Sequence, residues 1–128
     1  MVDKPINPGA LEAELRQFTG TEHYYKYMFN IVLTDGTKYL ADRAGAYWLM
    51  DVVASWQTAK KVACEHFQTW DLAVQEDKKA TVVAGDGDGD GNEIARQKIP
   101  YTDFPLRSQR LYLVNDGRYR VLMLPSEY

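Results

Sequence analysis

The spacing of hydrophobic positions changes along the chain, from a helical period in the first half to strict alternation in the second. Leu11, Leu15 and Phe18 recur at intervals of four and three residues, which places them on one face of a helix. Asn7 is a suitable N-cap for this helix, and Gly20 is a natural stop. The pattern predicts an N-terminal helix that packs one face on the body of the protein.

A second and more apolar helix is predicted after Asp42, which can serve as its N-cap. With successive residues 100° apart, Leu49 and Val53 point one way, whereas Asp51 and Ser55 point the other. More than half of the circumference is apolar, so this helix should lie beneath other elements. Asp51 is expected to face solvent rather than to act as a buried acid of raised pKa.

The segment between the two helices reads as a β-hairpin. Residues Tyr27–Leu33 are rich in strand-forming side chains, and Thr34–Gly36 carries a turn signal. Thr37–Ala41 would then return as the second strand of the hairpin.

From Phe67 onwards the hydrophobic period is two, because Trp70, Leu72 and Val74 alternate with less apolar residues. Further strands are predicted at Ala80–Ala84, at Glu93–Ile99, and in a last hairpin formed by Leu111–Val114 and Tyr119–Leu124 around Asn115-Asp116-Gly117. The expected fold is α+β. It is an antiparallel β-meander of about five to seven strands packed on one central helix, plus the N-terminal helix. One globular domain should span residues 1–128, with residues 1–6 disordered.

Composition and charge narrow the function classes. Aromatic residues make up 12% of the chain, including nine Tyr, and Tyr is enriched at protein interfaces. The net charge of −3 is too small to steer a partner strongly. Arg107, Arg110, Arg118 and Arg120 are a thin basis for nucleic-acid binding, which would normally need a clustered basic stripe.

The single cysteine, Cys64, excludes an internal disulfide and a Cys-rich zinc site, and a free thiol fits a reducing cytoplasm. Neither a signal peptide nor a membrane span is recognisable, so a soluble cytoplasmic protein is expected. Cys64 and His66 would share a face on a strand and could form a thiol–imidazole pair, but a lone cysteine is more often a small hydrophobe.

The run from Gly85 to Asn92 resembles the start of a calcium-binding loop. Asp86, Asp88 and Asp90 take its first, third and fifth positions, but Gln97 stands where a bidentate Glu is required. A flexible hairpin loop between two strands is the preferred interpretation. Weak cation binding by these three carboxylates remains the alternative.

Tyr24, Tyr25, Tyr27 and Phe29 form a dense aromatic group around Lys26. Alternate members are expected to enter the core, and a nucleic-acid stacking platform would require a basic groove that is missing here. If Tyr24 and Tyr25 are exposed together, they are candidates for a partner surface.

The common catalytic templates are missing, including the nucleophile elbow, the phosphate-binding loop, the metalloprotease motif and the dinucleotide fingerprint. No cofactor is expected. A carboxylate-only active site remains open, because Asp and Glu pairs leave no sequence signature.

Five segments together carry a resemblance: Phe18–Thr21, Thr34–Ala41, Ala44–Leu49, Ile99–Pro105 and Leu124–Tyr128. In this order the chain resembles an uncharacterised family of small proteins found in bacteria and on phages and other mobile elements. The resemblance runs from about residue 18 to the C-terminus, and members of the family similarly carry a Gly/Asp-rich loop. It implies no activity and no catalytic residue.

The leading hypothesis is a non-enzymatic cytoplasmic protein that binds a host protein, for example as an inhibitor of a defence system such as CRISPR. Tyr24, Tyr25 or the loop of Asp86, Asp88 and Asp90 would form the contact. The alternatives are a cation-binding module or carboxylate-dependent enzyme using the same loop, and a nucleic-acid accessory protein. The sequence leaves open the oligomeric state, and whether Leu124–Tyr128 is a strand end or a free tail.

Overall fold

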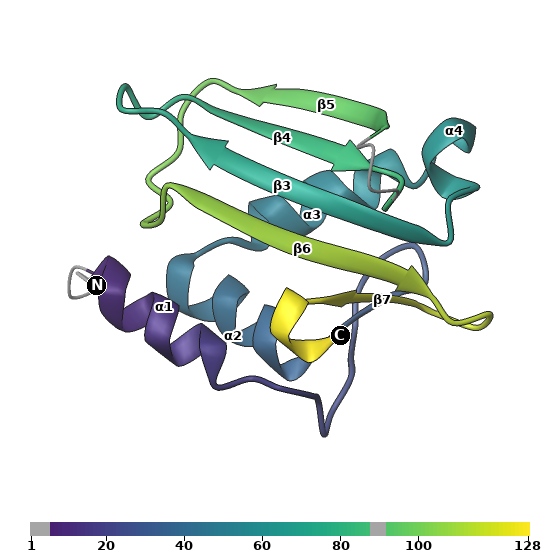
Figure 1. The fold of residues 1–128 in the computed structure, drawn as a ribbon. Coiled ribbons are helices and arrows are strands. Elements are labelled where there is room, and N and C mark those ends of the chain that lie inside the picture. The colour runs from purple at the N-terminus through teal and green to yellow at the C-terminus, as the bar shows by residue number, and fades with distance from the viewer. Residues whose placement is uncertain (1–5, 88–91) are drawn as a thin grey trace.

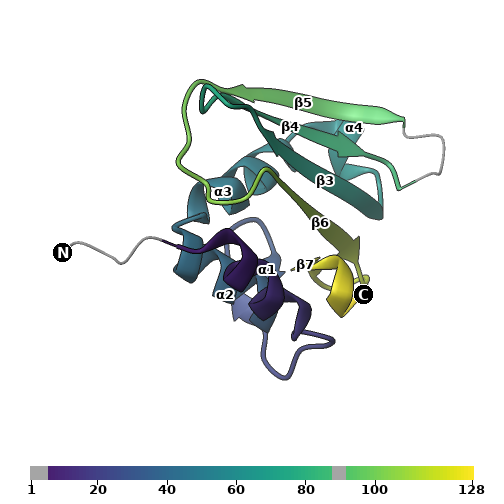
Figure 2. The same ribbon diagram turned by 60° about the vertical axis from the view of Figure 1, so that its left-hand side comes forward.

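A seven-stranded sheet forms the centre of the molecule, and its helices gather against one face of it (Figures 1 and 2). The structure is a computed structural model that describes residues 6–87 and 92–128. Residues 1–6 were expected to be disordered. Of these, residues 1–5 lie outside the described range, whereas Ile6 packs against the core. The helices are α1 (Pro8–Arg16), α2 (Asp35–Ala44), α3 (Tyr47–Trp56), α4 (Lys60–Ala63) and the 3₁₀ helix η1 (Pro125–Glu127).

The sheet order is β1-β2-β7-β6-β3-β4-β5, in which only the β2–β7 pair is parallel. The predicted α+β class is confirmed. The predicted strand number, the mostly antiparallel pairing and the N-terminal helix are confirmed as well. The strand order is not that of a plain meander, because the chain leaves β2 into three helices and a later strand, β7, takes the place beside it. The strands are β1 (Tyr25–Lys26), β2 (Ile31–Leu33), β3 (Phe67–Val74), β4 (Ala80–Gly85), β5 (Glu93–Ile99), β6 (Ser108–Asn115) and β7 (Arg120–Met123).

The second strand of the predicted hairpin, Thr37–Ala41, is wrong because these residues belong to helix α2. Thr34 is the N-cap of that helix. Its hydroxyl accepts a hydrogen bond from the amide of Thr37 at 3.3 Å, and the Thr37 hydroxyl accepts one from the amide of Thr34 at 2.9 Å. Gly45 ends the helix in the left-handed conformation, with φ of 62°. The Thr34–Gly36 signal therefore begins a helix instead of reversing a strand.

The predicted N-cap role of Asp42 is also wrong, since Asp42 lies inside α2, and α3 begins after Ala46 without a side-chain cap. The predicted orientation of α3 is confirmed. Leu49 and Val53 are buried in the core, whereas Asp51 is exposed. The prediction of one central helix plus an N-terminal helix is too simple, because four α-helices occur in residues 6–87 alone.

The predicted strand Tyr27–Leu33 is interrupted by a tight turn at Met28–Asn30. The amide of Tyr27 donates to the carbonyl of Ile31 at 2.8 Å, so β1 and β2 form a short antiparallel hairpin around this turn. The alternating strands predicted after Phe67 and the last hairpin are confirmed.

A buried polar network lies within the hydrophobic core. Gln68, which has no exposed surface, exchanges two hydrogen bonds with Gln57 at 2.9 and 3.0 Å and accepts a third from the indole of Trp70 at 3.0 Å. Arg120 of β7 donates to the same Gln57 at 3.1 Å. These bonds connect α3, β3 and β7, and they satisfy polar groups that would otherwise be costly to bury.

The chain end is neither of the two forms that the sequence left open. Pro125–Glu127 forms the short helix η1, which docks on the start of α2, and the residue after it, Tyr128, lies on the outer face of the sheet. There Tyr128 packs edge-on against Phe67 and Tyr112. In the part of the chain that the structure describes, no helix combines the length and the apolar character needed to cross a membrane.

Candidate protein-binding surface

Large exposed hydrophobic side chains are concentrated on the β1–β2 hairpin. Among the described residues, four of the six exposed large hydrophobics are Tyr24, Tyr25, Met28 and Phe29, with exposed fractions of 61%, 36%, 44% and 53%. We call these four side chains the hairpin surface. Apolar side chains scattered singly over a protein surface need no explanation, but four within six residues are an unusual concentration.

The tip of the hairpin has a strained backbone. Phe29 and Asn30 have φ values of 54° and 64°, in the left-handed region that a bulky residue such as Phe rarely adopts. The conformation is maintained by Asn30, whose side-chain amide donates to the carbonyl of Arg118 at 2.7 Å and whose carbonyl accepts from the amide of Arg120 at 3.0 Å. The β6–β7 hairpin thus fixes a turn that presents Phe29 to solvent. Strain of this kind is concentrated at functional sites.

The segment before β1 is fixed by Asp35, the first residue of α2. Its carboxylate accepts hydrogen bonds from the amide of Glu22 at 2.9 Å and from the hydroxyl of Tyr25 at 3.1 Å. Its own amide donates to the hydroxyl of Thr21 at 2.8 Å. The hydrogen bond from Glu22, followed by that from Tyr25, lowers the pKa of Asp35. Helix α2 therefore anchors the chain that leads into the hairpin surface.

A second group of contacts supports the hairpin from helices α2 and α3. The ammonium group of Lys38 lies 5.5 Å from the ring centre of Tyr25 and 6.0 Å from that of Tyr47. Lys38 also pairs with Asp42 at 2.6 Å, and the hydroxyl of Tyr47 donates to the same carboxylate. Tyr27 stacks on Tyr47 with 6.3 Å between ring centres. The hydroxyl of Tyr27 donates to the carboxylate of Asp51 on α3, the exposed residue that the sequence predicted to face solvent.

The pKa values of the residues that support the hairpin are shifted in the direction that keeps each side chain in its ordinary charge state at neutral pH. Burial, with a hydrogen bond to Asp51, raises the pKa of Tyr27 well above its usual range. Carboxylate partners likewise raise the pKa values of Tyr25, Tyr47 and Lys38, and Lys38 in turn lowers that of Asp42. These hydrogen bonds and ion pairs fix the side chains that support the hairpin.

The structure separates the two regions that the sequence proposed for partner contact. Tyr24 and Tyr25 lie at one end of the sheet beside β1, whereas Asp86 follows β4 near the other end. The amide of Asp86 donates to the carbonyl of Asn92 at 3.2 Å, and the side-chain amide of Asn92 donates to the Asp86 carboxylate at 3.1 Å. Asp88 and Asp90 lie outside the described residues. Within the residues searched, no three potential metal-ligating side chains converge.

The thiol–imidazole pair, which the sequence made the less favoured interpretation of Cys64, is not supported by the structure. Cys64 ends helix α4, where its thiol donates to the carbonyl of Lys61 at 3.3 Å, and β3 begins only at Phe67. Cys64 and His66 therefore do not share a face of one strand, as the sequence prediction required.

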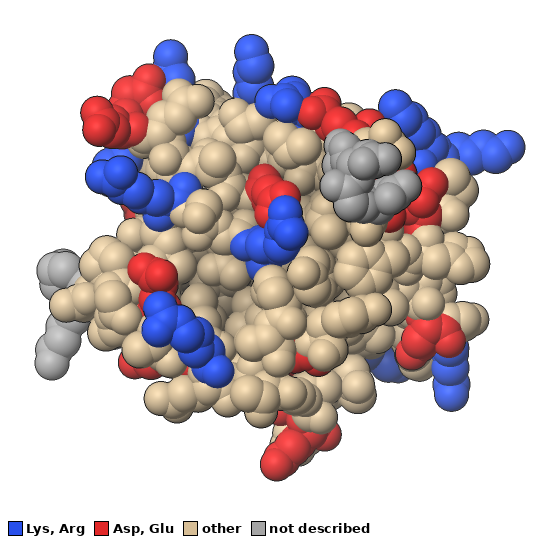
Figure 3. Space-filling view, in the orientation of Figure 1, with Lys and Arg blue, Asp and Glu red and all other residues tan. Residues whose placement is uncertain are grey.

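The four C-terminal arginines do not form one basic stripe. Arg110 makes a two-pronged ion pair with Asp71 at 2.7 and 2.9 Å, and Arg120 is engaged in the buried network. Arg107 and Arg118 lie beyond opposite ends of β6. On the face of the molecule seen in Figure 3, charges of both signs are interspersed.

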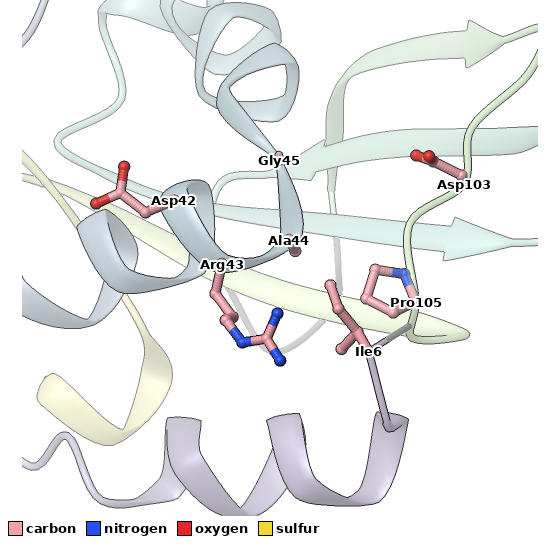
Figure 4. A pocket seen from close by; sticks show the side chains of 7 residues that line it. All are labelled: Ile6, Asp42, Arg43, Ala44, Gly45, Asp103 and Pro105. Atoms are coloured by element: carbon pink, nitrogen blue, oxygen red, sulfur yellow. The ribbon is translucent and has the colours of Figure 1, made fainter. Parts of the chain in front are cut away.

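A cavity of about 780 Å³ opens at the C-terminal end of α2 (Figure 4). Figure 4 shows Asp42 and Asp103 on opposite sides of it, with the guanidinium group of Arg43 pointing toward α1. Polar groups that converge on one point distinguish ligand sites, and these three charged side chains diverge. The hairpin surface is consequently the stronger candidate site.

Sequence reasoning missed Met28 and Phe29 as members of the surface, and it missed Asp35 and Lys38 as its supports. The aromatic density of residues 24–29 was the available signal. The exposure of Phe29 depends on the left-handed turn, which has no glycine to announce it.

Comparison with known proteins gives a fold relationship and a family. A solved structure described as the crystal structure of the protein of unknown function from Enterococcus faecalis is similar to the chain, with a TM-score of 0.52 and 16% sequence identity. The similarity covers 77% of this chain and 90% of that one, and at this identity it shows the fold alone. A search of the curated proteins found no match. The profile of a protein family of unknown function, DUF6876, matches residues 9–128.

Proposed function

For this chain, which belongs to the family of unknown function DUF6876, we propose a non-enzymatic role in which it binds another protein through the hairpin surface. The observation that carries the proposal is the exposure of Tyr24, Tyr25, Met28 and Phe29 on one short hairpin with a strained tip. Aromatic residues and Met are enriched at the centres of protein interfaces, where a few such anchors supply most of the binding energy.

The support beneath the hairpin favours binding for a second reason. The carboxylate of Asp35 and the ammonium group of Lys38 both contact Tyr25, and Tyr27 is fixed between Tyr47 and Asp51. A surface held in one conformation before it meets its partner loses less conformational entropy on binding. The hydrogen-bonded and stacked tyrosines are thus what a pre-organised interface requires.

The finer form of the proposal is a cytoplasmic inhibitor of a host defence complex, such as a CRISPR effector. Its support is the resemblance to small proteins of phages and other mobile elements, which often act by binding host proteins. Asp86, which follows β4, is far along the sheet from the hairpin surface. It would have to serve as a separate contact.

The experiment is affinity capture from host lysate with the tagged protein and two variants. Met28→Ser/Phe29→Ser removes the tip of the hairpin surface, and Tyr101→Ser is the matched control, because Tyr101 is 67% exposed elsewhere. A host protein captured in stoichiometric amount by the wild type and by the control, but lost with the double variant, supports the proposal. Equal capture by all three proteins overturns the assignment of the surface. Thermal unfolding of each variant establishes that it is folded.

A further inference from the structure

A second cavity, of about 480 Å³, lies directly beside the hairpin surface. Val32 of β2 and Val121 of β7 are almost fully buried, with 5% and 8% exposed, and form its floor. The register pairs Lys26 with Val32 and Val32 with Val121, so the three side chains stand in one row on the same face of the sheet. The remaining lining residues are Tyr24, Asp116, Arg118 and Tyr119.

The charge of this cavity is unbalanced. The carboxylate of Asp116 accepts hydrogen bonds from the amides of Tyr119 at 2.7 Å and Arg118 at 2.9 Å, which lower its pKa. Within residues 6–87 and 92–128, neither Lys26 nor Arg118 forms a salt bridge with a carboxylate. The guanidinium group of Arg118 rests 5.3 Å from the ring centre of Tyr119. Two cations and the ionised carboxylate of Asp116, which also interacts with Arg118, leave one positive charge in excess around an apolar floor, and this complements an anionic group on an apolar segment.

The backbone beside the cavity is open to a further strand. β1 stands at the end of the sheet order, and among the described strands only β2 pairs with it. The amide of Tyr27 donates to the carbonyl of Ile31 opposite it, and such hydrogen-bonded positions alternate in antiparallel strands. The Lys26–Val32 pair is therefore a non-hydrogen-bonded one, and the N–H and C=O groups of Lys26 point away from β2. A partner strand would find an unpaired donor and acceptor there.

Resting on the proposed function, we infer that the partner contributes an extended acidic segment, which adds to the free edge of β1 and places a carboxylate beside Lys26, at the mouth of the cavity that Arg118 also lines. Side chains alternate along β1, so Tyr24 and Lys26 face the cavity while Tyr25 faces Asp35. Main-chain hydrogen bonds to Lys26 would supply affinity, and the two cations would select an acid at the side chain that enters the cavity.

The test uses a fluorescein-labelled peptide of alternating valine and glutamate, with a valine–glutamine peptide as its uncharged match. The valine–glutamate peptide should bind, and the affinity should fall with added salt, because the charges are exposed. Lys26→Gln and Arg118→Gln should each weaken binding roughly tenfold, whereas Lys98→Gln on the opposite edge strand should not. Amide exchange of Lys26 should slow in the complex.

Three results overturn the inference: equal binding of the glutamine peptide, no loss with either Gln variant, or binding of single-stranded oligothymidine in place of the peptide. The inference and the proposed function fail separately in the capture experiment. If Met28→Ser/Phe29→Ser abolishes capture while Lys26→Gln/Arg118→Gln leaves it unchanged, the hairpin surface stands and the acidic-segment inference falls. If neither double variant reduces capture, both fall.

Discussion

The carboxylate of Glu127 accepts a hydrogen bond of 2.6 Å from the hydroxyl of Thr34, 93 residues earlier in the chain. The same carboxylate accepts a hydrogen bond from the amide of Gly36 at 3.0 Å and, within its own turn, another from the amide of Leu124 at 2.9 Å. Glu127 therefore supplies a negative charge and an acceptor to the unsatisfied start of helix α2. Because α2 also holds the segment that leads to the hairpin surface through Asp35, the C-terminus and the candidate binding surface share one support.

Glu127→Ala should destabilise the fold by about 1–2 kcal/mol, since it leaves a part-buried hydroxyl and a helix N–H group without their acceptor. Urea unfolding followed by circular dichroism measures the difference. Ser126→Ala is the control, because Ser126 is an exposed neighbour in the same turn. If both variants unfold at the same urea concentration, the Glu127 cap does not stabilise the protein.

Gly36→Ala should destabilise the fold although alanine normally favours a helix. A Cβ atom at Gly36 would lie 2.5 Å from Oε1 of Glu127 and 2.6 Å from Cδ1 of Leu124, so these two side chains would have to move away from the start of α2. We expect a loss of about 1–3 kcal/mol in the free energy of unfolding. Gly20→Ala is the control, because a Cβ there would meet nothing within 4 Å. A Gly36→Ala protein as stable as the Gly20→Ala protein would show that η1 does not pack tightly on α2.

The sequence predicted the parts of the fold that depend on local periodicity. Strand β3 was found because Trp70 and Leu72 alternate with less apolar residues, and β5 was found because turn residues bound its run. Thr34–Gly36 was misread since threonine followed by Asp-Gly is compatible with both a reverse turn and a helix start. The decisive partner, Glu127, lies at the far end of the chain. A contact over that sequence distance leaves no local pattern.

The candidate site likewise combines features that a local sequence pattern predicts with features that depend on distant contacts. The clustering of Tyr24 and Tyr25 was visible in the sequence. Their exposure was not, because it depends on β1 lying at the edge of the sheet and on the place that β7 takes beside β2. The parallel pairing joins residues about 90 positions apart, such as Val32 and Val121, and no short-range signal encodes it.

Gln68→Leu should be among the more destabilising single changes in the core. It would leave the buried indole N–H of Trp70 without its acceptor and remove two hydrogen bonds from the side chain of Gln57, which keeps those to Val53 and from Arg120. We expect a cost of about 2–4 kcal/mol in urea unfolding. Gln75→Leu, at an exposed position, is the control. A small effect would mean that water replaces the lost partners.

Asp35→Asn should reduce stability at neutral pH more than in acid. The folded-state pKa of Asp35 lies below its ordinary value, mainly through the hydrogen bond from the amide of Glu22. Its contribution is therefore present above the unfolded-state pKa of about 4 and is lost as the pH falls through the lower, folded-state value. Unfolding of the wild type and Asp35→Asn at pH 7, 5 and 3 should give a difference that shrinks only at the last pH. A difference that is constant across the three would exclude the ionised carboxylate as its cause.

Phe29→Gly should separate stability from binding. Glycine adopts a φ of 54° without the steric cost that a Cβ atom brings, and Phe29 is 53% exposed, so little packing is lost. After allowance for the greater freedom of glycine in the unfolded chain, we expect the variant to be as stable as the wild type or up to about 1 kcal/mol more stable. Phe29→Ala removes the ring but keeps the Cβ atom, so it should gain nothing. Both variants should lose partner capture, because both remove the aromatic anchor. Retained capture by Phe29→Gly would show that the strained turn presents Phe29 for some purpose other than binding.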